Sequence, residues 1–291
     1  IPNLFGGSAD LGPSNKSVMK DREYYSPENP SGSNIHFGIR EFAMTAMANA
    51  ISLHGGLRPY IAGFFVFSDY MKAGMRLSAL MEQPVISILT HDSIGVGEDG
   101  PTHQPIEHLA ALRSMPGYTV IRPCDTHETA AAWYLALTRK QPTGIVLSRQ
   151  TLPLLKETGK DALKGAYILQ NCDGKPDIIL MATGSEVELI YKAYDILTEK
   201  GIKVRTVSMP SFEVFEEQSD EYKESVLPNS VRARVAVEAA SDFGWYKYVG
   251  LDGKVICMHG FGESAPAGEL FKKFGFTVDN VVNTAIEVLN K

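Results

Sequence analysis

The sequence predicts an α/β protein with two three-layer domains, each a mostly parallel sheet between two layers of helices. Short apolar runs rich in β-branched residues alternate with stretches of helical periodicity, which is typical of βα units. The chain has 291 residues, 44% of them hydrophobic and 21% charged, and this length is enough for two cores of roughly 100 to 150 residues each. A polar stretch without sustained periodicity, residues 151–165, is predicted to link the two domains.

The first domain is expected to span residues 1–155. It begins with a predicted glycine-rich turn at Gly6 and Gly7. Thr126 is the candidate N-cap of an alanine-rich helix. In chain order, the other elements are expected at 58–64 (strand), 68–81 (helix), 84–90 (strand), 105–114 (helix), 118–123 (strand), 126–140 (helix) and 143–149 (strand).

The second domain is expected to span residues 156–291 and to continue the same alternation. The turn ATGSEVELI places Gly184 and Ser185 between a strand and a helix, which predicts a helix cap, with a phosphate site at the helix N-terminus as the alternative. We predict packing and dimer support for this domain, including its segment FGESAPAG, and no chemistry. Its elements are expected at 177–183 (strand), 185–201 (helix), 203–209, 233–239 and 254–262 (strands) and from about 279 (helix).

Charge and cysteine content argue against several function classes. The formal net charge is -6 and the lysines and arginines are scattered, so no basic face for nucleic acid is expected. The three cysteines, Cys124, Cys172 and Cys257, form no CxxC pair, which argues against a disulfide framework or a zinc site and favours a reducing compartment. No apolar run reaches the roughly 18 residues of a membrane helix and no signal peptide is recognisable. We therefore expect a cytoplasmic protein without a membrane partner.

The densest polar cluster is THDSIGVGEDGPTHQ, residues 90–104, directly after a predicted strand. In open α/β sheets ligands bind beyond the carboxyl ends of strands, so a functional site is predicted here in preference to a plain surface loop. The spacing of its histidines and acids matches no usual zinc pattern, and no metal is predicted. The titratable side chains in this loop are His91, Asp92, Glu98, Asp99 and His103.

Three further candidates each have a structural alternative. Glu41 lies near the start of a predicted helix, where an acid by itself only complements the helix dipole. The aromatic run with Phe64, Phe67 and Tyr70 is, taken alone, more typical of a core. Arg149 ends a predicted strand and could bind phosphate with two parallel hydrogen bonds or form a surface ion pair.

These segments occur together, and in this order, in one family. The chain resembles transketolase from Gly6 almost to its C-terminus. The loop is the most specific segment, because the related pyruvate dehydrogenase β-type chains share the fold but not the loop. The matching segments are GGSADLGPSN, IHFGIREFAM, FFVFSDY, THDSIGVGEDGPTHQP, LSRQ, ATGSEVEL and FGESAPAGELFKKFGFT.

The resemblance implies thiamine diphosphate-dependent transfer of a two-carbon ketol unit from a ketose phosphate to an aldose phosphate, in the pentose phosphate pathway. A domain of the thiamine diphosphate-binding fold would hold the pyrimidine, followed by a transketolase C-terminal domain. Glu41 would bind N1′ of the aminopyrimidine and share a proton with it. Phe67 would stack on the pyrimidine ring, with Phe64 and Tyr70 completing that wall. Asp10 would lie near the thiazolium.

The resemblance also implies the substrate contacts. Ser14, His91 and Arg149 would hold the sugar phosphate. Asp99 would bind a substrate hydroxyl. His103 would hydrogen-bond the sugar near the reacting carbons, which makes it the second catalytic candidate beside the helix acid. A homodimer is expected, because the family builds its site across a two-fold interface.

Family members also carry an N-terminal domain, with a GDG motif, that binds Mg²⁺ and the diphosphate, and no such segment occurs in this sequence. The chain is therefore expected to need that domain as a partner and to be inactive alone. Because it begins at Ile1 rather than methionine, we expect a fragment of a longer enzyme rather than a split-gene subunit. The alternatives are part of a dihydroxyacetone synthase-like enzyme, an α-keto acid dehydrogenase β-type subunit, and a non-catalytic dimerisation or regulatory module.

Overall fold

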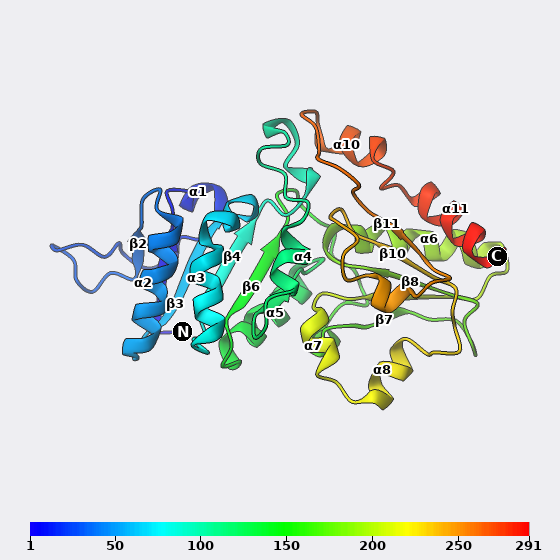
Figure 1. Cartoon of the computed structure of the whole chain (residues 1–291), viewed down its shortest axis with the longest axis horizontal. Coiled ribbons are helices and arrows are strands. Elements are labelled where there is room, and N and C mark those ends of the chain that lie inside the picture. The colour runs from blue at the N-terminus through cyan, green and yellow to red at the C-terminus, as the bar shows by residue number, and fades with distance from the viewer. Residues whose placement is uncertain (291) are drawn as a thin grey trace.

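The computed structural model describes residues 1–290 and contains two α/β units, one after the other along the chain (Figure 1). The first unit holds a six-stranded sheet in the order β2-β1-β3-β4-β6-β5. Every neighbouring pair in this sheet is parallel, as predicted. Its strands are β1 (Leu4–Ser8), β2 (Asn34–His36), β3 (Arg58–Phe64), β4 (Ile86–Thr90), β5 (Thr119–Ile121) and β6 (Thr143–Leu147).

Helices cover both faces of this first sheet. Buried side chains of α2, α3 and α4 join one core cluster, whereas those of α5 join a cluster on the opposite face. The three-layer arrangement follows from strands that are apolar on both sides and must be covered twice. The helical elements are α1 (Gly12–Asn15), α2 (Glu41–His54), η1 (Phe65–Phe67), α3 (Ser68–Leu80), η2 (Ile94–Asp99), α4 (His108–Arg113) and α5 (Thr126–Thr138).

The second unit holds a five-stranded sheet in the order β11-β10-β8-β9-β7, parallel except for the edge strand β7. Its strands are β7 (Tyr167–Gln170), β8 (Ile178–Ala182), β9 (Val204–Ser208), β10 (Arg234–Val237) and β11 (Lys254–Ile256). Its helical elements are η3 (Lys160–Lys164), η4 (Gly184–Glu186), α6 (Val187–Glu199), α7 (Phe212–Glu216), α8 (Asp220–Val226), α9 (Tyr246–Val249), α10 (Ala267–Lys273) and α11 (Val278–Leu289). The predicted class of two mostly parallel α/β domains is therefore confirmed.

The predicted turn at Gly6 and Gly7 is wrong, because both residues belong to the internal strand β1. A Cβ on Gly6 would lie 1.9 Å from the carbonyl oxygen of Tyr60, and a Cβ on Gly7 would lie 2.0 Å from that of Ile35. Glycine is needed here for close approach of neighbouring backbones and not for a turn.

The predicted cap of α5 is also wrong by one residue. Asp125 is the N-cap and accepts a hydrogen bond from the amide of Glu128 at 2.9 Å, while Thr126 is the first helical residue. The same carboxylate accepts from the hydroxyl of Thr158 at 2.5 Å and from the amide of Leu155 at 3.2 Å. The polar stretch predicted as a linker is thus partly buried and tied to the first unit.

A buried ion network joins the two units. Arg122, which follows β5, is fully buried and contacts Asp92 at 2.8 Å and Glu186 at 2.5 Å. Glu238 is also fully buried and accepts two hydrogen bonds from Arg113, at 2.7 and 2.8 Å. Burial alone would raise the pKa of Glu238, but Arg113 lowers it to about 2. Glu186 and Glu238 of the second unit therefore each pair with an arginine of the first unit.

The turn ATGSEVELI contributes to this network instead of capping a helix. The hydroxyl of Thr183 donates to Glu238 at 2.5 Å, and no side chain caps η4 or α6. A Cβ on Gly184 would lie 2.6 Å from the guanidinium carbon of Arg122. The predicted helix cap is therefore wrong, and the guanidinium occupies the space beside this turn.

Within residues 1–290, no helix is both long enough and apolar enough to cross a bilayer.

Replacing Arg122 with alanine is expected to destabilise the chain by about 3–5 kcal/mol, because it leaves buried carboxylates without their cation. Arg232→Ala is the matched control, since the Arg232–Asp252 ion pair is exposed and contributes less than about 1 kcal/mol. Urea unfolding of both variants measures the difference. Similar small losses of unfolding free energy in the two variants would contradict a buried ion network between the units.

Candidate active site

The residues predicted for the site lie at one edge of the first sheet. Each group follows a strand of the parallel sheet, and parallel strands open their carboxyl ends onto a common edge. Asp10 and Ser14 follow β1, Glu41 follows β2, Phe64 to Tyr70 end or follow β3, His91 to His103 follow β4, and Arg149 follows β6.

His91 is the most constrained of these residues. It is buried and adopts a left-handed backbone conformation with φ 64°. Its ring stacks on Phe64, with 3.7 Å between centroids and 22° between planes. The Thr90 hydroxyl donates to Asn15 Oδ1 at 2.8 Å and lies 2.9 Å from His91 Nδ1. Thr90 therefore links the His91 ring to Asn15 through its hydroxyl.

The electrostatics of His91 show which other charged residues lie nearby. Burial lowers the pKa of His91, and Arg149 and His103 lower it further, while Asp99 and Asp92 raise it. The net direction is downward, so the ring is neutral at pH 7. Four charged or titratable side chains from two loops thus act on one imidazole.

An aromatic wall continues from Phe64 toward His103. The rings of Phe64 and Phe67 are almost parallel, with 6.0 Å between centroids and 7° between planes. Phe67 also meets Tyr70 at 6.2 Å and the edge of His103 at 5.5 Å. Phe64 is buried, Phe67 is half-buried and Tyr70 is exposed, so the wall opens to solvent at its outer end.

The packing of α2 on α3 sets the level of Glu41 along α3. Thr45 lies against Gly74, and Ser78 donates a hydrogen bond to Asn49. The two helices therefore run parallel, as they do side by side in Figure 1. One turn earlier on both helices, the same offset brings half-buried Glu41 level with Tyr70.

Asp10 and Ser14 are less closely connected to this wall than the other candidate residues. Asp10 is exposed with φ 60° and lines a cavity of about 200 Å³ with Tyr24 and His36. Across residues 1–290, no hydrogen bond or ion pair ties Asp10 or Ser14 to the cluster around His91. The connection runs instead through the neighbouring Asn15, which the sequence analysis did not single out.

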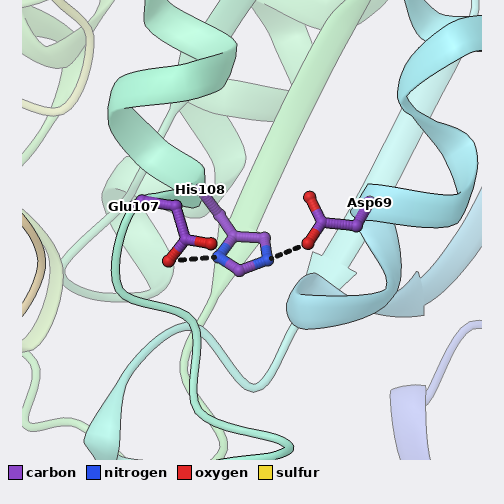
Figure 2. A group of neighbouring side chains, drawn as sticks. All are labelled: Asp69, Glu107 and His108. Carbon is purple, nitrogen blue, oxygen red and sulfur yellow. Dashed lines mark hydrogen bonds and ion pairs between the residues drawn. The ribbon is translucent and has the colours of Figure 1, made fainter. Parts of the chain in front are cut away.

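Figure 2 shows a second polar cluster, formed by Asp69, Glu107 and His108. His108 is buried, with Nε2 at 3.2 Å from Asp69 and Nδ1 at 3.7 Å from Glu107. The two carboxylates thus face opposite ring nitrogens, whose lone pairs diverge, so one metal ion cannot bind all three groups in this arrangement. The imidazole instead links the start of α3 to the start of α4 through its contact with Asp69.

Comparison with known proteins shows the family of this chain. A family model for the transketolase pyrimidine-binding domain matches residues 1–154. The chain belongs to the transketolase family. A second model, for the transketolase-like C-terminal domain, matches residues 165–277. The aromatic wall and the histidine loop of this transketolase-family chain both lie in the part matched by the pyrimidine-binding model.

Relatives with high sequence identity include longer transketolases. Transketolase 1 of Vibrio parahaemolyticus is 53% identical over 293 residues, which is 99% of this chain and 44% of that protein. The transketolase of Halalkalibacterium halodurans is 53% identical with the same coverage. The chain thus spans less than half the length of the curated transketolases it matches.

Solved transketolases share the fold closely. Transketolase from Leishmania mexicana has a TM-score of 0.96 and 44% identity, covering 100% of this chain and 43% of that one. A Pichia stipitis transketolase in complex with sedoheptulose-7-phosphate has a TM-score of 0.94 and 42% identity, with the same coverage. A split-gene transketolase, described as an inactive beta4 tetramer, matches with a TM-score of 0.80 and 22% identity. The match covers 99% of this chain and 93% of that one, and at this identity it shows the fold alone.

Replacing Arg149 with leucine is expected to raise the pKa of His91, because the guanidinium lowers it. Replacing Asp99 with asparagine is expected to lower it further, because the carboxylate raises it. NMR titration of the imidazole resonances in the isolated chain measures both shifts. Arg232→Leu, an exposed arginine of the second unit, should leave the midpoint unchanged. Identical midpoints in all three variants would show that the charged residues do not surround this ring.

Proposed function

We propose that this chain supplies the pyrimidine-binding part and the C-terminal domain of a transketolase. The reaction is transfer of a two-carbon ketol unit from a ketose phosphate to an aldose phosphate, in the pentose phosphate pathway. One observation supports this proposal most strongly. Charged groups surround His91 beside an aromatic wall, at the edge where the parallel strands of one sheet have their carboxyl ends. Complexes of Pichia stipitis transketolases with sugar phosphates support the substrate class.

The site has the chemical features that the pyrimidine half of thiamine diphosphate requires. Glu41 offers a half-buried carboxylate for a ring nitrogen, with which it would share a proton. Phe67 offers a half-buried ring for stacking, with Phe64 behind it and Tyr70 at the open end. Asp10 would face the thiazolium side. When bound, the cofactor supplies the electron sink for carbon–carbon bond cleavage.

The remaining site residues are proposed to hold the sugar phosphate. Ser14, His91 and Arg149 would bind the phosphate. Asp99 would accept a hydrogen bond from a sugar hydroxyl, and His103 would orient the substrate near the reacting carbons and move a proton there. Protonation of His91 would make both ring nitrogens donors for the phosphate, and a nearby dianion favours the protonated form.

The partners follow from the same proposal. Residues 1–155 and 156–291 are proposed as the pyrimidine-binding and C-terminal domains, and Mg²⁺ with the diphosphate would be held by an N-terminal domain outside this sequence, in the intact chain or in trans. A cytoplasmic homodimer is proposed. Exposed apolar side chains on the first unit support an interface there: Ile39, Phe42, Met47, Leu53, Tyr70, Leu77 and Leu80.

The test is ketol transfer from xylulose 5-phosphate to ribose 5-phosphate, with thiamine diphosphate and Mg²⁺, by this chain alone and joined to a diphosphate-binding domain. Activity is expected only in the joined protein. Glu41→Gln should reduce it by roughly 100-fold to 10,000-fold, the typical contribution of general acid–base catalysis. Glu188→Gln is the matched control, because Glu188 is also a first-turn helix acid but pairs with exposed Lys192.

Two outcomes would contradict the proposal. Activity of the chain alone would show that no diphosphate-binding domain is needed. A joined protein that folds and binds cofactor without transferring ketol units would favour a non-catalytic module.

A further inference from the structure

We propose that the second unit positions the substrate loop of the first. The positioning segment is 261–267, part of FGESAPAG, and the loop is 91–104, which carries three of the proposed substrate contacts. The inference rests on the proposed function for its catalytic consequence, but the contacts themselves do not depend on it. From the sequence alone, this segment is predicted to serve only packing and dimer support.

Gln104 is the first contact between segment and loop. It is buried, and its Nε2 donates to the Gly97 carbonyl at 2.8 Å and to the Glu263 carbonyl at 2.9 Å. The first bond closes the loop on itself, while the second fixes the closed loop to the second unit. Both amide hydrogens are used, so the side chain cannot rotate without losing a bond.

Ser264 is the second contact. Its hydroxyl donates to the carbonyl of Glu98 at 2.5 Å, next to Asp99 in the chain. The side chain of Gln104 lies so close to Gly262 that a Cβ on Gly262 would lie 1.7 Å from Gln104 Oε1. A larger residue at this position would therefore displace the amide of Gln104.

The buried junction holds the other end of the same loop. Asp92, adjacent to His91, contacts Arg122 at 2.8 Å, and Arg122 contacts Glu186 of the second unit at 2.5 Å. The loop is thus fixed at its start by ions and at its end by hydrogen bonds. These two attachments together set the relative positions of His91, Asp99 and His103. Gln104 and Ser264 are positioning residues, since neither is proposed to touch substrate.

Hydrogen–deuterium exchange of the 291-residue chain tests the contact directly. The amides of Val96, Gly100 and His103 bond within the loop. Ser264→Ala is expected to speed their exchange by roughly threefold to tenfold, the loss of one hydrogen bond. Ser225→Ala is the matched control, because its hydroxyl donates to the local Tyr222 carbonyl. Unchanged loop exchange in Ser264→Ala would overturn the proposal.

Kinetics of the joined enzyme test the consequence. Ser264→Ala should raise KM for the ketose phosphate by roughly threefold to tenfold, with thiamine diphosphate affinity unchanged, and Ser264→Thr should restore KM because it keeps the hydroxyl. Faster exchange with unchanged KM would overturn the positioning role. If the unsubstituted joined enzyme is inactive, the proposed function fails, whereas loop exchange still decides whether the segment holds the loop.

Discussion

The parallel direction of the strands in the first sheet constrains where this chain can hold a ligand. Because β1, β3, β4 and β6 run the same way, their carboxyl ends open onto one edge, and the loops that follow must share the space beyond it. Residues as distant in sequence as Asp10 and Arg149 are delivered to that edge by topology alone. Topology thus fixes where the site lies, and the residue that follows each strand fixes its chemistry.

The junction between the units extends this constraint to the second sheet. Arg122 also follows a strand of the first sheet, and it binds one carboxylate in the site loop and another in the second unit. Buried ions are tolerated only where their partners are complete, so the loop and the second unit must keep a fixed relation. The second unit is therefore part of the architecture of the site, although it offers none of the proposed contacts to cofactor or substrate.

Sequence periodicity predicted most strands and helices, because their apolar faces are set locally. It failed at β1, where glycines in a strand resemble a turn until the neighbouring backbones are known. The loop with His91 and His103 was predictable because polar side chains crowd into few residues after an apolar strand. The bonds from Thr90 to Asn15 and from Gln104 to Glu263 were not, since each joins residues far apart in the chain. Such pairs depend on packing between elements, which no local pattern encodes.

The charge balance around His91 indicates how the site can respond to an anionic substrate. Burial and Arg149 hold the ring neutral, whereas Asp99 and Asp92 act in the opposite direction. Opposing influences of this kind leave the protonation state sensitive to any further charge. A phosphate beside the ring would add negative charge and favour the imidazolium, in which both ring nitrogens are donors. Because Nδ1 already contacts Thr90, Nε2 would be the nitrogen left to donate to a ligand, so proton uptake and phosphate recognition at this residue would be one event.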